Sequence, residues 1–252
     1  MSDIPKRERP RRTVRSYVRG RGRITSGQRK ALDRHWLPFG IGFSAEPLDL
    51  DAVFGRVAPR VLDIGSGMGE TTVKLALAHP ENDYLAIEVH QPGVGSLLRR
   101  AAEARVRNLR VIAHDAVEVL RRQIPDRSLD EAYVFFPDPW PKKRHHKRRL
   151  VSKSFLALLV PRLKSHARLC LATDWPDLAE HMLKTCDGFP GLENLAGKGC
   201  FAPRPAWRPA TKFERRGARL DHVVRDLVYS PAPSSPSKDA IAVKSRRPRA
   251  GR

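Results

Sequence analysis

Short apolar runs alternate with amphipathic segments from residue 60 to about residue 186. Runs of five or six mostly apolar residues are typical of buried strands, and we expect strands at residues 60–64, 84–88, 109–113, 131–136 and 168–173. Apolar positions with helical spacing predict helices at residues 71–79, 93–106, 117–123, 150–163 and 176–186. Residues 189–219 carry many Gly, Pro and Arg residues and are expected to loop over one edge, before a last strand at residues 222–229.

Strands that alternate with helices of this length predict an α/β fold. Consecutive strands joined by a helix are parallel, and the crossover between them is right-handed in nearly all proteins. We therefore expect a parallel sheet with helices on both faces. The 252 residues are enough for one medium-sized domain with extensions.

The two ends of the chain differ in composition from its middle. Residues 1–22 are basic, contain proline and have almost no aliphatic side chains, so we expect a disordered arm. Residues 230–252 are rich in Pro and Ser and then basic, which predicts a disordered tail. The folded domain is thus expected at residues 23–229. It should begin with a short helix capped by Thr25 or Ser26.

Positive charge dominates the composition. Lys and Arg total 48 against 27 Asp and Glu, which gives a formal net charge of +21 and a pI near 10.8. Such an excess implies an anionic partner, and nucleic acid is the leading candidate. An anionic membrane is the competitor, but the chain has no apolar run long enough to span a bilayer and no basic amphipathic helix with a strong aromatic face.

The N-terminus and the cysteines indicate a cytoplasmic protein. The N-terminus lacks the apolar region of a secretory signal. Cys170, Cys186 and Cys200 are widely spaced and include no Cys-x-x-Cys pair. We therefore expect reduced, structural thiols and no metal site.

An acidic residue stands at or just past the carboxyl end of each of the five central strands. These residues are Asp63, Glu88, Asp115, Asp138 and Asp174. Ligands of open α/β sheets bind outside the carboxyl ends of the strands, near the point where the strand order reverses. One such acid is often only a helix cap, but five at one edge predict a functional crevice.

A glycine-rich turn, Gly65-Ser66-Gly67-Met68-Gly69, follows the first of these strands and allows a ligand to approach the backbone. Glu88 comes about twenty residues later, where a carboxylate can accept hydrogen bonds from ribose hydroxyls. NAD and S-adenosyl-L-methionine both fit this arrangement. Asp115 suits an exocyclic adenine amine. The charge of Asp63 would repel a pyrophosphate and attract an ammonium or sulfonium group, so we favour S-adenosyl-L-methionine.

The fourth strand continues into the block Phe136-Pro137-Asp138-Pro139-Trp140, and the basic run Lys142-Lys143-Arg144-His145-His146-Lys147-Arg148-Arg149 follows. A basic run by itself is most often a solvated face. A carboxylate between two prolines, with a tryptophan two positions on, instead indicates a site that handles a base while the adjacent cations hold phosphates. Trp140 is expected either to stack on a base or to pack within the protein.

These motifs, together with Ile87-Glu88-Val89-His90 and three others, resemble the bacterial tRNA (guanine-N7)-methyltransferase family. The three others are Gly22-Arg23-Ile24-Thr25, Ala172-Thr173-Asp174 and Thr211-Lys212-Phe213-Glu214. The Pro-Asp-Pro-Trp and Thr-Lys-Phe-Glu blocks are highly specific, whereas many methyltransferases share the glycine turn. The resemblance covers roughly residues 15–229. It implies a Rossmann-like class I methyltransferase with a mostly parallel seven-stranded sheet and helices on both faces.

This family transfers a methyl group from S-adenosyl-L-methionine to N7 of a guanosine in tRNA, at position 46 of the variable loop. The resemblance implies cofactor contacts from Asp63, Glu88, Asp115 and Asp138, to which the glycine turn adds Gly65 and Gly67. Asp138 is also the implied catalytic residue. Substrate contacts are implied for Lys142, Arg144, His145, His146, Lys147, Arg148, Arg149, Asp174, Thr211, Lys212, Phe213 and Glu214. The expected partner is tRNA, with no membrane and no metal, and the expected state is a monomer or weak homodimer.

Guanine N7 carries a lone pair and no proton, so methyl transfer to it needs no base. The reaction needs in-line placement and compensation of the charge that moves onto the purine. We expect Asp138 to orient the guanine through its N–H donors and to offset that charge. The alternatives are a methyltransferase that acts on another RNA or on an amino group, a non-catalytic RNA-binding module on the same fold, and an NAD-dependent oxidoreductase.

Overall fold

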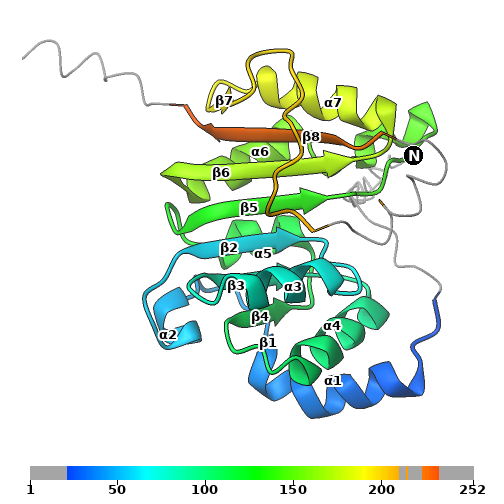
Figure 1. Cartoon of the computed structure of the whole chain (residues 1–252), viewed down its shortest axis with the longest axis vertical. Coiled ribbons are helices and arrows are strands. Elements are labelled where there is room, and N and C mark those ends of the chain that lie inside the picture. The colour runs from blue at the N-terminus through cyan, green and yellow to red at the C-terminus, as the bar shows by residue number, and fades with distance from the viewer. Residues whose placement is uncertain (1–21, 210–213, 215–222, 233–252) are drawn as a thin grey trace, which may run out of the picture.

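The computed structural model describes residues 22–209, 214 and 223–232, so all but the last residue of the predicted arm and most of the predicted tail lie outside the described residues. Within them, the strands form one eight-stranded sheet in the order β1-β4-β3-β2-β5-β6-β8-β7 (Figure 1). The strands are β1 (Gly40–Ile41), β2 (Arg60–Ile64), β3 (Asp83–Ile87), β4 (Leu109–Ile112), β5 (Leu129–Phe135), β6 (Leu163–Thr173), β7 (Leu192–Asn194) and β8 (Arg225–Pro231).

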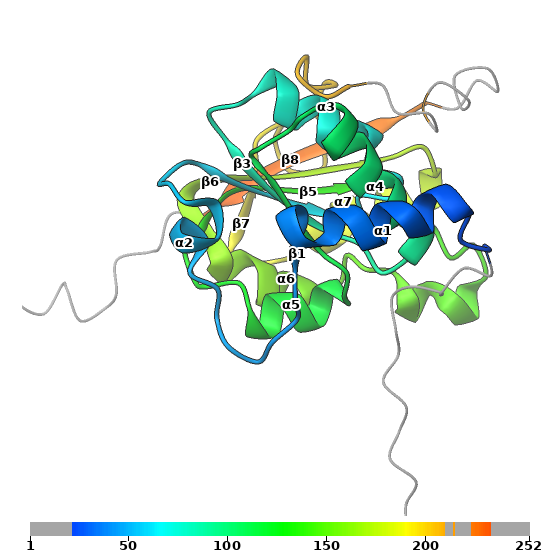
Figure 2. The same ribbon diagram turned by 90° about the horizontal axis from the view of Figure 1, so that it is seen from below.

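Helices cover both faces of this sheet (Figure 2). The helices are α1 (Ser26–Phe39), α2 (Leu50–Phe54), α3 (Glu70–Ala78), α4 (Gln91–Glu103), α5 (Ala116–Arg122), α6 (Lys153–Leu159) and α7 (Pro176–Asp187), with 3-10 turns η1 (Lys143–Arg148) and η2 (Val160–Arg162). Apolar side chains of α1, α3 and α4 form one core against one face. Those of α5, α6 and α7 form a second core against the other.

The central strands are buried on both faces. Every residue of β2 and β3 is buried, as expected for parallel strands between two helical layers. Neighbouring residues contribute to opposite cores, since Val61 packs with α3 and α4 while Leu62 packs with α5 and α6. The predicted α/β sheet with helices on both faces is confirmed.

The strand order reverses at β2. This strand pairs in parallel with β3 on one side and with β5 on the other. β3 pairs with β4 and β5 pairs with β6, again in parallel, whereas β8 is antiparallel to both β6 and β7. The carboxyl ends of β2 to β6 therefore lie at one edge of the sheet. The sheet has eight strands in the described residues rather than seven because the two-residue β1 adds to β4.

Several predicted boundaries were wrong, and the largest differences lie at α6 and β6. The expected helix at residues 150–163 is shorter, because the Ser152 hydroxyl caps α6 at its start and Pro161 lies in the 3-10 turn that follows it. β6 begins at Leu163 rather than at residue 168, and Leu163 pairs with Leu129 of β5. Polar residues in this first half of β6 concealed its strand character. The short elements β1, α2 and β7 were not predicted.

Helix α1 begins as the sequence predicts. Thr25 is the N-cap, and it forms a capping box in which its hydroxyl accepts from the Gln28 N–H and the Gln28 side chain accepts from the Thr25 N–H. The helix then lies against α4 at Gly95, where only a hydrogen atom fits beside the Gln28 backbone. α1 is therefore fixed to the layer that carries the glycine turn.

Replacement of Gly95 by Ala should destabilise the protein. A Cβ at this position would lie 2.6 Å from the Gln28 carbonyl oxygen, which cannot move without displacing α1. Overpacking of this kind costs about 1–3 kcal/mol, so the urea midpoint should fall. Gly27→Ala is the matched control, because a Cβ there meets nothing within 4 Å and alanine favours a helix by up to about 1 kcal/mol. Equal midpoints for the two variants would contradict the packing.

Candidate active site

The five acids predicted at the strand ends lie along one edge of the sheet. Asp63 is the fourth residue of β2, and Glu88 and Asp174 directly follow β3 and β6. Asp115 and Asp138 stand three residues past the ends of β4 and β5. Since β2 to β6 are parallel, these positions share the edge to which the arrowheads point (Figure 1). The predicted acid-lined carboxyl edge is confirmed.

Most of these acids have no cationic partner. Within the described part of the chain, no ion pair involves Asp63, Glu88, Asp115 or Asp138. The opposite edge differs, because buried Asp83 of β3 is ion-paired with both Arg56 and Arg60. A buried carboxylate without a counter-ion is unfavourable. The carboxyl edge is therefore suited to a cationic ligand.

Asp63 shows this most clearly. Its side chain is buried between β2 and α3, and its carboxyl accepts a hydrogen bond from the Thr72 hydroxyl. Burial raises the pKa of Asp63 to about 6, the Thr72 hydrogen bond opposes this shift, and the charge of Glu88 adds to it. A positive charge beside this carboxyl would stabilise its ionised form.

The glycine turn after β2 depends on its glycines for its shape. Gly65, Gly67 and Gly69 have φ values of 79°, 56° and 77°, in the left-handed region that glycine adopts at little cost. Gly93 of α4 lies so close to the turn that a Cβ there would be 2.6 Å from the Gly67 carbonyl oxygen. The turn is thus packed against α4, and its backbone is bare on the ligand side.

Glu88 connects this turn to the start of α4. Its Oε2 accepts from the Gly67 N–H at 2.7 Å, and its Oε1 accepts from the His90 N–H at 2.7 Å. Burial raises the pKa of Glu88, while these backbone donors lower it. Each oxygen has a second lone pair, so the carboxylate can also accept hydrogen bonds from a ribose.

Asp115 is both a helix cap and a candidate contact. Its Oδ1 accepts from the Val117 N–H at 2.8 Å at the start of α5, whereas Oδ2 makes no hydrogen bond within the described residues. Beside it the rings of Phe43 and His114 stack with centroids 3.7 Å apart and an angle of 12°. Sequence reasoning missed Phe43, since a single aromatic residue in a Gly-containing segment carries no signal. The stack presents an apolar surface next to the predicted adenine contact.

The turn after β5 has an unusual backbone. Phe136 and Trp140, on either side of the Pro-Asp-Pro segment, have φ values of 52° and 46°. Such values are uncommon for residues other than glycine and concentrate at functional sites. The Phe136 N–H donates to the Ala172 carbonyl at 2.7 Å, which attaches the turn to β6. Asp138 is exposed at this turn, but the atoms around its carboxyl displace part of its hydration and raise its pKa.

Half of the eight residues of the basic run are exposed to solvent. Its exposed residues are Lys142, Lys143, Arg144 and Lys147, and its half-buried residues are His145, His146 and Arg148. The Arg148 guanidinium lies over the Trp140 ring at 5.0 Å, and the His145 ring meets the same indole edge-on at 5.8 Å. Trp140 thus packs against this loop, which favours the second of its two predicted roles.

Arg149 differs from the rest of the run. It is 4% exposed, and its guanidinium forms an ion pair with Asp177 of α7. The predicted phosphate contact does not fit this position, because the charged group is turned into the protein and already has acceptors.

The Thr-Lys-Phe-Glu block is only partly described. Thr211, Lys212 and Phe213 lie outside the described residues. Glu214 is buried, and its two oxygens accept hydrogen bonds from Arg208 at 2.9 and 3.2 Å. The predicted substrate contact does not fit Glu214, because its carboxylate faces the protein.

Arg208 was missed by sequence reasoning. It is buried between Glu214 and Asp226 of β8, and it donates to the Asp226 carboxylate at 2.7 and 3.0 Å. Its guanidinium also lies 5.8 and 5.9 Å from the ring centres of Phe135 and Phe136. An arginine in a Pro-rich segment gives no sign that it will be buried. Arg208 thus joins the Glu214 segment to β5, the strand that leads to Asp138.

Asp174 lies at the turn next to that of Asp138, since Phe135 of β5 pairs with Ala172 of β6. The following residue, Trp175, is 39% exposed and is the N-cap of α7. The two adjacent strands therefore each carry an acid and a tryptophan just past their ends.

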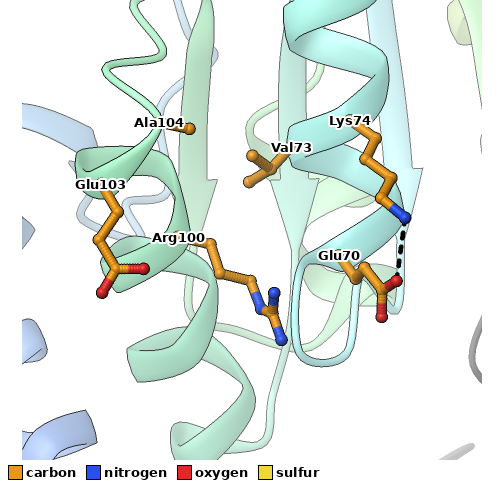
Figure 3. Close-up of a pocket in the computed structure, with 6 residues that line it drawn as sticks. All are labelled: Glu70, Val73, Lys74, Arg100, Glu103 and Ala104. Atoms are coloured by element: carbon orange, nitrogen blue, oxygen red, sulfur yellow. Dashed lines mark hydrogen bonds and ion pairs between the residues drawn. The ribbon is translucent and has the colours of Figure 1, made fainter.

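A separate hollow lies between α3 and α4 (Figure 3). It has a volume of about 250 Å³ and is lined by Glu70, Val73, Lys74, Arg100, Glu103 and Ala104. Glu70 and Lys74 pair at 3.0 Å, and Arg100 extends between the helices. It contains none of the predicted site residues, so it is distinct from the acid-lined edge.

In the part of the chain that the structure describes, no helix is both long and apolar enough to cross a membrane. The same residues include no cluster of three or more His, Cys, Asp or Glu side chains arranged to hold a metal ion. Cys170 and Cys186 are buried free thiols, as expected of structural cysteines, while Cys200 is exposed.

Replacement of Asp63 by Asn should stabilise the ligand-free protein at neutral and alkaline pH. Because the folded-state pKa is raised from 3.8 to about 6, ionised Asp63 opposes folding above pH 6. This effect is lost as the pH falls toward 4. The shift corresponds to at most about 3 kcal/mol. In urea unfolding, the free energy of unfolding of Asp63→Asn should be higher than that of wild type at pH 8. The difference between the two proteins should be smaller at pH 4.

Asp130→Asn is the control of opposite sign. Burial opposes the shift, but hydrogen bonds from Lys164, the Arg60 N–H and His166 lower the pKa of Asp130, so this variant should lose stability at pH 8. A pH-independent difference between Asp63→Asn and wild type would contradict the assignment of a raised pKa to Asp63.

Comparison with known proteins identifies the family. A family model described as "Putative methyltransferase" matches residues 57–227. The tRNA (guanine-N(7)-)-methyltransferase of Edwardsiella ictaluri (strain 93-146) is 53% identical over 218 residues, which are 86% of this chain and 92% of that protein. The enzyme of the same name from Nitrosomonas eutropha (strain DSM 101675 / C91 / Nm57) is 52% identical over 219 residues, or 87% of this chain and 97% of that protein.

Solved structures support the fold. The 16S rRNA methyltransferase KamB matches 75% of this chain and 95% of its own with a TM-score of 0.57 and 18% identity. A variant of the 16S rRNA (adenine(1408)-N(1))-methyltransferase from Catenulisporales acidiphilia matches 75% of this chain and 94% of its own, with a TM-score of 0.50 and 15% identity. The identity to relatives over nearly their whole length, on this fold and with these motifs, shows that the chain belongs to the tRNA (guanine-N7)-methyltransferase family.

Proposed function

We propose that the protein transfers a methyl group from S-adenosyl-L-methionine to N7 of a guanosine in the variable loop of tRNA. The observation that carries this proposal is the pairing of two opposite charge environments at one edge. Asp63 and Glu88 are buried acids without cationic partners at the strand ends, and a cationic loop with exposed lysines follows the turn of Asp138 at the same edge. The first suits a cationic cofactor, and the second suits a polyanionic substrate.

The residues present fit the cofactor. When bound, it supplies an electrophilic methyl group on a sulfonium. Asp63 offers a counter-charge to the cationic part, and the bare backbone of the glycine turn allows close approach. Glu88 can accept from the ribose hydroxyls, and Asp115 can accept from the adenine amine beside the Phe43–His114 stack.

Asp138 is the proposed catalytic residue. Its carboxyl stands on a backbone held at both ends, by the Phe136 hydrogen bond to β6 and by the packing of Trp140. From there the carboxylate can accept hydrogen bonds from the N–H groups of guanine and so hold N7 in line with the methyl carbon. Its negative charge can also offset the positive charge that develops on the purine. No proton has to be removed from N7.

Asp174, at the neighbouring strand end, is a proposed substrate contact. The exposed cations of the basic run are the proposed phosphate contacts. Contacts of this kind set affinity and register but do not select a base. The cytoplasm, where tRNA is available, is the proposed location. A monomer or weak homodimer stays a prediction.

Methylation of an unmodified tRNA transcript with labelled S-adenosyl-L-methionine tests the proposed function. Label should appear on one variable-loop guanosine, and a transcript with 7-deazaguanosine there should accept none, because it lacks the nucleophile. Asp138→Ala should lower kcat/KM by about 100-fold or more, with cofactor affinity retained. Methyl transfer to the 7-deaza transcript or to protein would refute the proposed reaction, and near-normal turnover of Asp138→Ala would refute the role of Asp138.

The salt dependence of tRNA binding tests the cationic loop. Neutralising Lys147 and Arg148 with Gln should reduce the slope of log affinity against log salt by about 0.9 for each lost contact. Arg107→Gln with Arg122→Gln is the matched control. Both arginines are exposed at the opposite edge of the sheet, where Arg107 follows α4 and Arg122 is the last residue of α5, so the double control should keep the wild-type slope. A slope unchanged by the loop substitutions would show that this loop does not bind phosphate.

A further inference from the structure

Arg149 stands at the centre of a set of contacts that joins three segments of the site. Its Nε donates to the Pro139 carbonyl at 3.1 Å. Its Nη1 donates to the Asp177 carbonyl at 3.4 Å, and its Nη2 forms the ion pair with the Asp177 carboxylate. The same Nη2 lies 3.1 Å from His146 Nε2 within the basic run.

These partners are neighbours of the proposed site residues. Pro139 directly follows Asp138 in the turn after β5. Asp177 lies in the first turn of α7, three residues after Asp174. One buried guanidinium therefore bridges the turn that carries the proposed catalytic carboxylate and the helix start that follows the neighbouring acid.

Only arginine can make this set of contacts. A planar guanidinium presents five N–H donors in fixed directions, and here they point to a carbonyl on one side and to a carboxylate and a second carbonyl on the other. A lysine ammonium could reach one of these groups but could not span both turns. The side chain is nearly completely buried, so its contribution comes from these acceptors and not from solvent or a distant anion.

Successive arginines of the run thus differ in their contacts. Arg148 is half-buried and lies over the Trp140 ring, whereas Arg149 is buried and donates to the Pro139 carbonyl. Arg149 should therefore affect turnover, whereas the exposed lysines of the run should affect tRNA affinity.

We propose that Arg149 is a positioning residue for methyl transfer, which holds the 137–139 turn against the start of α7 and so fixes Asp138 in its working place. This inference rests on the proposed role of Asp138. It assigns Arg149 no contact with RNA phosphate, in contrast to the other cations of the run.

The test is to separate kcat from tRNA affinity in Arg149→Met and in Lys143→Gln/Lys147→Gln, which removes two exposed cations of the same run. Arg149→Met should lower kcat by about 10- to 100-fold, since small misplacements of a reacting group have effects of this size. Its KM for tRNA should stay within about 3-fold of wild type and its salt slope should not change. The Lys143/Lys147 variant should show the reverse pattern, with a raised KM, a shallower slope and a nearly normal kcat, because both lysines are exposed. Arg149→Lys should restore only part of the lost kcat.

Asp177 provides a second variant that spares the core, because its side chain is 62% exposed. Asp177→Ala should lower kcat by about 3- to 10-fold, and the double variant with Arg149→Met should be no slower than Arg149→Met alone, as expected for partners in one interaction. If Arg149→Met does not fold, the kcat of Asp177→Ala decides the question.

Three results would overturn the inference: loss of tRNA affinity at unchanged kcat in Arg149→Met, additive losses in the double variant, or normal kcat in Asp177→Ala. The Asp138→Ala measurement is independent of all three. If Asp138→Ala is impaired while the Arg149 and Asp177 variants turn over normally, the proposed function stands and only the positioning role fails.

Discussion

Parallel pairing of β2 with strands on both of its sides is the constraint on which the rest of the structure depends. It sets the carboxyl ends of five strands along one edge, and it places the reversal of strand order between the β2 and β5 turns. The glycine turn and the Pro-Asp-Pro turn are neighbours for this reason alone. Every proposed function of the edge follows from which residues these turns carry.

Two buried arginines then hold the long connections in place at that edge. Arg149 joins the β5 turn to α7, and Arg208 joins the Glu214 segment to β8 beneath the rings of Phe135 and Phe136. Arg208 satisfies two carboxylates that would otherwise be buried without partners, whereas Asp177, the partner of Arg149, is 62% exposed. The chain has a large excess of basic residues, and some of them, such as Arg149 and Arg208, thus stabilise the fold rather than bind substrate.

Sequence reasoning located the central strands, the acids at their ends and the start of α1 at Thr25 or Ser26, because apolar periodicity, chain order and the capping preference of Thr and Ser are local properties. It could not separate Arg149 from Arg148, since burial depends on a helix that arrives about thirty residues later. The same holds for Glu214, whose partner Arg208 has no local signal. The first half of β6 was missed because its pairing with β5 outweighs the polar character of its residues.

The unpaired carboxylates along the edge have a consequence for charge movement. Methyl transfer to N7 relocates one positive charge from sulfur to the purine, and the total charge of the bound molecules does not change. A single deep carboxylate would favour the charge at its starting point and so oppose the reaction. Acids distributed from Asp63 to Asp138 offer a negative charge near both the initial and the final location of the positive charge. The electrostatic field of the crevice therefore need not oppose the transfer.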